Sequence, residues 1–144
     1  MNVNPSNDRI LLAGRALLAS LFIVIGATKL LSVAGFTRYF AAKGMPFPEA
    51  MPYVAFLIEV GGGLVLLLGI KTRVMAVLFI LYTIAATLIS HRFWASPDAA
   101  TQGADLINFF KNLAIIGGFT LLFGAGGGRY SVDAWRAAGR DSLK

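Results

Sequence analysis

Residues 51–70 read MPYVAFLIEVGGGLVLLLGI, an apolar stretch that contains a single charged side chain, Glu59. A helix of about 20 apolar residues crosses the roughly 30 Å hydrocarbon core of a bilayer. A charge at the centre of a bilayer costs at least about 2.5–3.5 kcal/mol on insertion scales, so such a residue faces the protein interior or a water-filled cavity. The stretch therefore predicts a membrane-spanning helix with a buried acidic group.

Three further apolar stretches of similar length lie at residues 10–31, 73–90 and 106–123. Of the 144 residues, 57% are hydrophobic and only 14% are charged, whereas soluble domains carry about 25% charged residues. Helices are expected because isolated strands would leave backbone groups unpaired in lipid. We therefore expect an all-α polytopic membrane protein, a single domain over residues 1–144 with four transmembrane helices in an antiparallel bundle.

The basic residues are distributed unequally between the two ends of the expected bundle. Both termini and the turn at residues 69–72 fall at one end, and the two longer loops fall at the other. The first end carries Arg9, Lys71, Arg73, Arg129, Arg136, Arg140 and Lys144, and the second carries Arg38, Lys43 and Arg92. Because cytoplasmic loops are enriched in Lys and Arg, both termini are expected to be cytoplasmic.

The glycine-rich segment after the fourth apolar stretch predicts a hinge into the tail. Residues 124–144 are expected to form a cytoplasmic tail in which Ser131 caps a short helix. Trp135 and Arg136 in that helix are typical of a segment that lies at the membrane interface.

Polar and aromatic side chains gather at the predicted outer ends of the spans. They are Lys29 in the first span, Glu59 in the second, His91 and Trp94 after the third, and Asn108, Lys111 and Asn112 in the fourth. Glu59 shares a helix face with Gly62 and Gly63, and small residues permit close helix packing in membranes. Gly26 and Gly118 are expected to serve the same purpose. Glu59 should therefore point into the bundle, toward a net-positive pocket that opens outward.

Several of these residues also have a structural interpretation. Glu59 could neutralise Lys29 or Lys111 and only fix the helix register, and Lys29 could instead extend to the outer interface. His91 is either a proton-transfer group or an ordinary interfacial residue. Trp94 fits an aromatic belt as well as it fits a stacking platform for a ring-shaped ligand.

The composition excludes several functional classes. The sequence has no cysteine, so it provides no thiol couple, disulfide or cysteine-ligated cluster of its own. With His91 as the single histidine, we expect no metal site and no intrinsic cofactor. The net charge of +6 is explained by membrane topology, and no nucleic-acid partner is expected. Arg15 and Arg73, near the cytoplasmic ends, are expected to anchor their helices at lipid phosphates.

Taken in order, the motifs resemble those of the DoxX family of small four-span membrane proteins. The matching segments are Glu59-Val-Gly-Gly-Gly, Leu-Gly-Ile-Lys-Thr72-Arg73, His91-Arg-Phe-Trp94, Ile107-Asn-Phe-Phe-Lys111-Asn112-Leu-Ala and Gly-Arg-Tyr-Ser-Val-Asp at 128–133. The resemblance covers nearly the whole chain. It departs from the family at Gly127, where Gly-Pro-Gly is frequent, and this affects the tail hinge only.

The resemblance implies a multi-pass protein of the bacterial inner membrane and an association with quinone-linked oxidoreductases. We therefore expect a subunit or accessory of such an enzyme, with a bound quinone or lipid in the outer pocket and no self-sufficient catalytic constellation. The alternatives are a binding or transport protein for a small anionic or amphipathic molecule, and a membrane scaffold without chemistry of its own. Expected partners are membrane lipids and either another oxidoreductase subunit or a second copy of the chain.

Overall fold

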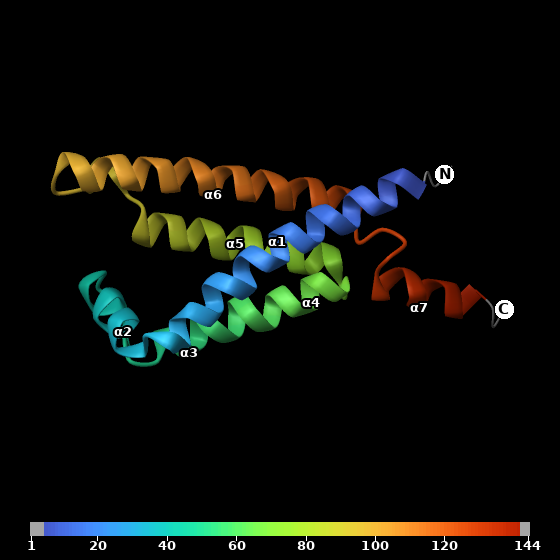
Figure 1. The fold of residues 1–144 in the computed structure, drawn as a ribbon, viewed down its shortest axis with the longest axis horizontal. Helices are drawn as coiled ribbons and strands as arrows, with labels where there is room; N and C mark the ends of the chain where they lie inside the picture. Colours follow the sequence, from blue (N-terminus) through green and yellow to red (C-terminus); the bar gives the residue numbers. More distant parts are fainter. Residues whose placement is uncertain (1–4, 142–144) are drawn as a thin grey trace.

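The computed structural model describes residues 5–141, which form helices joined by short connections (Figure 1). The helices that build the spans are α1 (Pro5–Leu31), α3 (Met51–Phe56), the π-helical turn η1 (Leu57–Gly61), α4 (Gly62–Leu68), α5 (Thr72–Ser90) and α6 (Ala99–Ala125). The shorter elements are α2 (Val33–Ala42), the 3-10 turn η2 (Phe93–Ala95) and α7 (Val132–Asp141). Within this part of the chain no strand is present.

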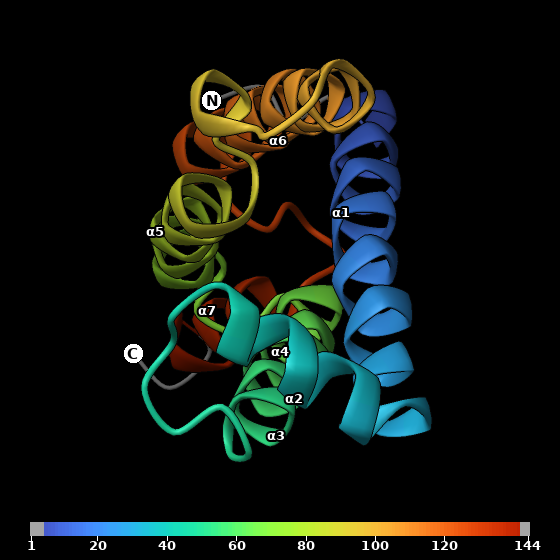
Figure 2. The same cartoon turned by 90° about the vertical axis from the view of Figure 1, so that its left-hand side faces the viewer.

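Four stretches of the described chain are long and apolar enough to cross a membrane. They are Asn7–Leu31, Met51–Leu68, Thr72–Ala95 and Ala99–Ala125. Seen along the bundle, α1, α4, α5 and α6 surround a common axis (Figure 2). The expected all-α fold with four spans is thus confirmed.

Two helical segments extend beyond the apolar pattern. The last span begins at Ala99 and not near residue 106, because Asp98 caps it: the Asp98 carboxylate accepts hydrogen bonds from the Thr101 N–H at 2.9 Å and from the Thr101 hydroxyl at 2.8 Å. In addition, the expected loop around residues 38–52 begins with the helix α2. Hydropathy alone does not reveal either feature: the first depends on the Asp98 cap, and α2 is a short helix of only 10 residues.

The core of the bundle is aromatic. Phe22, Phe79 and Phe119 are buried, with ring centroids 4.4 Å apart for Phe22 and Phe79 and 5.2 Å apart for Phe79 and Phe119. Many other large apolar side chains are exposed; Leu31 and Leu121, for example, are 85% and 77% accessible. Such faces suit contact with lipid, because lipid tails are as apolar as leucine.

Glycines permit close approach between the spans. A Cβ atom at Gly63 would lie 2.7 Å from Ile23 Cγ1 on α1, and one at Gly62 would lie 3.0 Å from Phe79 Cζ on α5. A Cβ atom at Gly118 would meet only the Leu18 side chain, at an ordinary 3.4 Å. Gly118 thus faces α1, but the approach of the two helices there leaves room for a Cβ atom, unlike at Gly62 and Gly63.

Both ends of the described chain lie at the same end of the bundle as the connection between α4 and α5, while α2 lies at the opposite end (Figure 1). This relative arrangement agrees with the sequence analysis. That the first end faces the cytoplasm stays a prediction, and Lys144, one of the basic residues behind it, lies outside the described residues.

Arg15 is enclosed by the protein and does not reach lipid. Its side chain is 1% exposed, and its guanidinium donates hydrogen bonds to the carbonyl oxygens of Gly127 and Tyr130. The glycine-rich segment folds back over the end of α1 and covers the charge, so the expected lipid-anchoring role of Arg15 is wrong. Arg73, in contrast, is exposed and donates to the Gly124 carbonyl at 3.2 Å.

Asp133 fastens the tail to the start of α5. Its carboxylate accepts hydrogen bonds from the Lys71 N–H at 2.7 Å, the Thr72 N–H at 2.8 Å and the Thr72 hydroxyl at 3.1 Å. Burial alone would raise the pKa of Asp133, but these hydrogen bonds and the Arg136 charge outweigh it and lower the pKa. Ser131 caps α7 by accepting from the Ala134 N–H at 3.2 Å.

Replacing Asp133 by Asn should weaken this end of the bundle in a pH-dependent way. At neutral pH the variant should lose about 0.5–2 kcal/mol, as for other lost helix caps. Because the folded-state pKa is depressed, the wild type loses the same contribution as the pH falls below the ordinary aspartate value of about 3.9. The difference in thermal unfolding midpoint should therefore shrink from about pH 7 to about pH 3.

The matched control is Glu49→Gln, which neutralises an exposed acid in the loop after α2. A constant difference between Asp133→Asn and the wild type across the pH range would contradict the capping role.

Candidate functional site

Glu59 lies at the centre of the π-helical turn η1, where the helix widens from the regular i to i−4 bonding. Its side chain is 5% exposed. One carboxylate oxygen accepts a hydrogen bond from Lys29 Nζ at 2.5 Å, and the other accepts from the Tyr82 hydroxyl at 2.5 Å. Single π-turns are frequent at functional sites, and this one directs the acid into the bundle.

Lys29 does not extend to the outer interface. It is 6% exposed, and its ammonium lies 5.4 Å from the ring centroid of Phe36 on α2. The ammonium is therefore near both a carboxylate and the face of an aromatic ring. The structural interpretation in which Glu59 neutralises Lys29 describes this pair, while Lys111 takes no part in it.

Gly26 makes room for Glu59 on the facing helix. A Cβ atom at Gly26 would lie 2.7 Å from Glu59 Cβ and 2.9 Å from Val60 Cγ2. Real Cβ atoms do not approach so closely, so α1 and η1 need glycine at this position. The small residue and the buried ion pair thus belong to one contact.

Two threonine hydroxyl groups, those of Thr83 and Thr87, lie on the side of α5 that faces the bundle interior. Asn112 on α6 donates to the Thr87 hydroxyl at 2.9 Å, and that hydroxyl donates to the Thr83 carbonyl at 2.6 Å. The Thr83 hydroxyl is buried, yet it has no hydrogen-bond partner among the residues that the structure describes. A buried polar group without a partner costs about 1–3 kcal/mol, so this hydroxyl is a candidate contact for a ligand.

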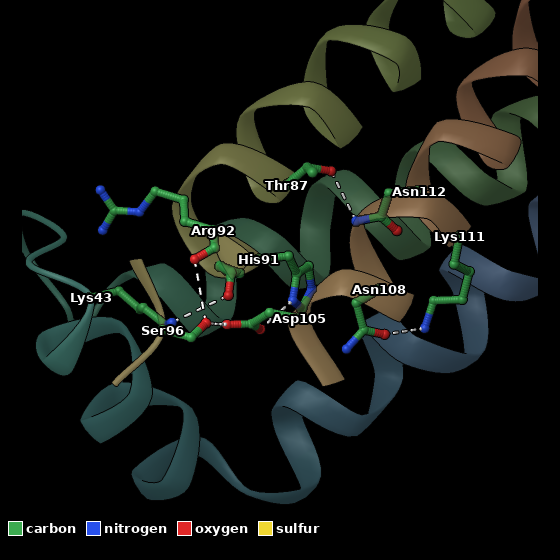
Figure 3. A network of polar contacts seen from close by, with 10 residues as sticks. Lys43, Thr87, His91, Arg92, Ser96, Asp105, Asn108, Lys111 and Asn112 are labelled. Carbon is green, nitrogen blue, oxygen red and sulfur yellow. Dashed lines mark hydrogen bonds and ion pairs between the residues drawn. The ribbon is translucent and has the colours of Figure 1, made fainter. Parts of the chain in front are cut away.

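His91 follows α5 and pairs with Asp105 on α6 (Figure 3). The His91 Nδ1 and Asp105 Oδ1 atoms are 3.3 Å apart, and the Ser96 hydroxyl donates to Asp105 Oδ2 at 2.8 Å. With the proton on Nδ1 shared with the carboxylate, Nε2 is left to act as an acceptor when the ring is neutral and as a donor when it is protonated. Sequence reasoning missed Asp105 because the last span was expected to begin at residue 106, which leaves Asp105 in the preceding loop.

Lys111 and Asn108 form a separate pair on α6. Lys111 is exposed, and its ammonium donates to Asn108 Oδ1 at 2.6 Å (Figure 3). Trp94 is 56% exposed and packs edge-on against Phe93 and Phe109, at centroid distances of 5.1 and 6.0 Å. The expectation that Trp94 is a neighbour of the buried cluster is therefore wrong, since η2 turns its ring outward.

A cavity of about 170 Å³ connects these groups between α1, η1, α5 and α6. Its apolar wall consists of Leu21, Phe22, Ile25, Ala86 and Ile115, and its polar wall consists of Glu59, Tyr82, Thr83, His91, Lys111 and Asn112. Of the residues predicted from sequence, four line this one cavity: Glu59, His91, Lys111 and Asn112. Lys29 and Asn108 do not line it, but they are hydrogen-bonded to Glu59 and Lys111. No group of three or more metal-binding side chains was found in the described residues.

Tyr82 is the second residue that sequence reasoning missed. It lies within an apolar stretch, where it does not stand out in a hydropathy plot, and it immediately precedes Thr83 in α5. A signal was nevertheless present, because a tyrosine in the middle of a span needs a partner for its hydroxyl group. The buried carboxylate of Glu59 is that partner.

Replacing Gly26 by Ala should destabilise the protein although alanine favours helix. The added methyl should cost about 1–3 kcal/mol by overpacking, which exceeds the gain of about 1 kcal/mol in helix propensity. Gly14→Ala on the same helix is the control, since a Cβ atom there meets nothing within 4 Å. Thermal unfolding in detergent should lower the midpoint for Gly26→Ala only. An equal rise in both variants would refute the contact.

The ion pair can be tested with a double-mutant cycle. Lys29→Met alone and Glu59→Gln alone each leave one buried group without its charge partner, and each should cost about 3–5 kcal/mol. The combined variant removes both charges and should be more stable than the sum of the single changes predicts. The free energies come from titration of the purified protein with dodecyl sulfate in mixed micelles. Strict additivity would show that the two groups do not interact.

Comparison with known proteins supports a membrane assignment. The chain is 37% identical to the inner membrane protein YphA of Escherichia coli K12 over 86% of its own length and 88% of the relative. It is 39% identical to the inner membrane protein YqjF of the same organism, over 85% and 88% of the two chains.

A more distant match is the Bacillus subtilis protein named "Putative oxidoreductase CatD", at 34% identity over 51% of this chain and 54% of the relative. No solved structure matches. The family model described as DoxX matches residues 10–92. With its four apolar spans, this chain is a multi-pass inner membrane protein, and it belongs to the DoxX family.

Proposed function

We propose that this protein binds the ring head group of a quinone in the cavity between α1, α5 and α6, as a subunit or accessory of a quinone-linked membrane oxidoreductase. The observation that carries the proposal is the composition of the cavity wall. Apolar side chains cover one side, and hydrogen-bonding groups converge from the other. This is the usual arrangement of a site for a small, flat and mainly apolar molecule.

The polar groups suit carbonyl oxygens. Quinone oxygens accept hydrogen bonds, and the cavity offers them the Thr83 hydroxyl, which has no partner among the described residues. It also offers the N–H groups that Asn112 and Lys111 retain beyond their bonds to Thr87 and Asn108. The Glu59 carboxylate is occupied by Lys29 and Tyr82. It therefore holds the Tyr82 ring at the wall and does not compete for these donors.

The charges favour a neutral ligand over an anionic one. The Lys29 and Glu59 charges cancel within a 2.5 Å pair, so the surplus positive charge expected from sequence reduces to Lys111 at the exposed rim. An anion would have only this one cation to bind, because the buried ammonium of Lys29 is neutralised by Glu59. A ring with polar oxygens would contact both the apolar side chains and the hydrogen-bond donors of the cavity wall.

The cavity volume limits what can enter. Sites for drug-sized molecules enclose about 300–1,000 Å³, whereas this cavity encloses about 170 Å³. The proposal therefore places only the head group inside. A bound quinone supplies two-electron chemistry, and the chain's own residues contribute orientation and protons, with His91 and Asp105 at the rim as the exchange point with water. The relative named as an oxidoreductase supports the redox assignment.

The first test identifies the retained molecule. The protein is extracted in mild detergent, and its organic extract is analysed by mass spectrometry. A quinone should be retained by the wild type and by Lys71→Met, a control at the opposite end of the bundle. Retention should fall about tenfold in Lys111→Met and Asn112→Leu, as for loss of one strong hydrogen bond. Retention of phospholipid alone, with no thermal shift on adding a quinone, would overturn the proposal.

Thr83→Val gives a sharper prediction because its two effects have opposite signs. The change keeps the shape of the side chain and removes a buried hydroxyl that lacks a partner. The ligand-free protein should therefore be stabilised, by up to about 1–3 kcal/mol, while quinone retention should fall. The quinone content is measured after mild extraction, and the midpoint of thermal unfolding is measured on the same protein after the quinone has been removed, because bound ligand would itself raise the midpoint. A fall in stability together with unchanged retention would contradict the assigned role.

A further inference from the structure

A second cavity lies beside the first, on the α2 side of the bundle. It encloses about 230 Å³ between the end of α2, α3 and α5. Its wall includes Phe40, Met45, Met51, Val54 and Ile89. Its lining is mainly apolar, with Tyr82 and Ser90 as its polar side chains, whereas charged groups, Glu59 and Lys111, line the first cavity.

The two cavities are neighbours on the same helix. Tyr82 and Ala86 of α5 line both of them. The Ala86 side chain is a single methyl group, so at this position only a small side chain stands between the two cavities. A molecule with a polar ring and an apolar chain would match the pair of cavities, with the ring on the Asn112 side and the chain on the Met51 side.

The apolar cavity opens on the exposed apolar surface of the bundle, which in the membrane contacts lipid. Val54 and Ile58 in its wall are 43% and 42% exposed on the surface of the bundle. At the aqueous end, Lys43 donates to the Ser90 carbonyl at 3.2 Å and joins the loop after α2 to the end of α5. A hydrocarbon chain can therefore enter this cavity from the bilayer, between Val54 and Ile58.

The side chains of the wall suit a flexible occupant. Met45 and Met51 are unbranched and adapt to irregular shapes. Because lipid tails are as apolar as the cavity, a chain gains little by transfer alone. The contribution of the cavity is instead to hold the chain in one direction and thereby orient the attached ring.

We infer that the apolar cavity holds the hydrocarbon chain of the same ligand whose head group occupies the polar cavity. The inference rests on the proposed quinone site and extends it: the protein selects a head group that carries a chain, and it receives this ligand laterally from the membrane. Tyr82, held by Glu59, forms the partition between ring and chain.

The test uses a benzoquinone with a decyl chain that carries a photoreactive diazirine. The full-length protein in lipid nanodiscs is irradiated with this probe, and the labelled residues are identified by mass spectrometry. Label should fall on the segments that line the apolar cavity, residues 40–58 and 85–90. Both decylubiquinone and the tailless ring should compete for it, because ring and chain belong to one molecule.

Two variants fill the cavity from opposite walls. Ala85→Trp and Val54→Trp each place an indole in or beside the apolar volume, and both positions line only that cavity. Because the indole would occupy the volume that the chain of the probe needs, the label should fall at least about fivefold in each variant. Leu81→Trp is the control, since Leu81 is 58% exposed and lines neither cavity. Unfolding midpoints show which variants are folded.

The outcomes separate this inference from the proposed function. Label spread over lipid-facing leucines, while the tailless ring still shifts the unfolding midpoint, would overturn the inference and leave the quinone site standing. Equal labelling of the cavity by a diazirine phospholipid, without competition from the ring, would show that a lipid chain occupies it and would also overturn the inference. If the ring neither shifts the midpoint nor competes, the proposed function itself is wrong.

Discussion

The ion pair between Lys29 and Glu59 is the interaction on which the rest of the structure depends. Moving two charges out of water costs several kcal/mol for each ion, and only a close geometry with further hydrogen bonds offsets this cost. Here the ammonium lies 2.5 Å from the carboxylate, and Tyr82 binds the second oxygen at 2.5 Å. The pair thereby joins α1, η1 and α5, and the missing side chain at Gly26 allows the two helices to approach closely enough to form it.

The same pair determines the chemistry of the cavity. Because the two buried charges cancel, the polar wall presents mainly uncharged donors, with Lys111 at the rim. Two donors remain for a ligand: the Thr83 hydroxyl, which has no partner among the described residues, and the second N–H of the Asn112 amide, whose first N–H is donated to Thr87. At the opposite end of the bundle, Arg15 and Asp133 hold the tail onto the spans through backbone groups. The tail is thus held against the spans at one end of the bundle, and the two adjoining cavities lie toward the other end.

Much of this could be predicted from the sequence, and the remainder has physical reasons for escaping it. Hydropathy revealed four spans because each is a long apolar run, and the spacing of Glu59, Gly62 and Gly63 correctly placed the acid inside the bundle. The π-turn at Glu59 left no signal, since it depends on how the helix meets α1 and α5. Arg15 was misread because nothing in its own helix shows that a tail more than 100 residues later covers it. Asp105 could not be predicted from the apolar pattern, which begins at residue 106, because the helix that carries Asp105 starts at Ala99, after the Asp98 cap.

The central claim is that a quinone carbonyl accepts hydrogen bonds from the donors of the polar cavity. Infrared difference spectroscopy measures this directly, since hydrogen bonding lowers the carbonyl stretching frequency of a quinone. With a carbonyl-labelled quinone, the band should shift to lower frequency on binding to the wild type, and the shift should be reduced in Asn112→Leu. A band that keeps the position it has in lipid, in the presence of saturating protein, would contradict the account.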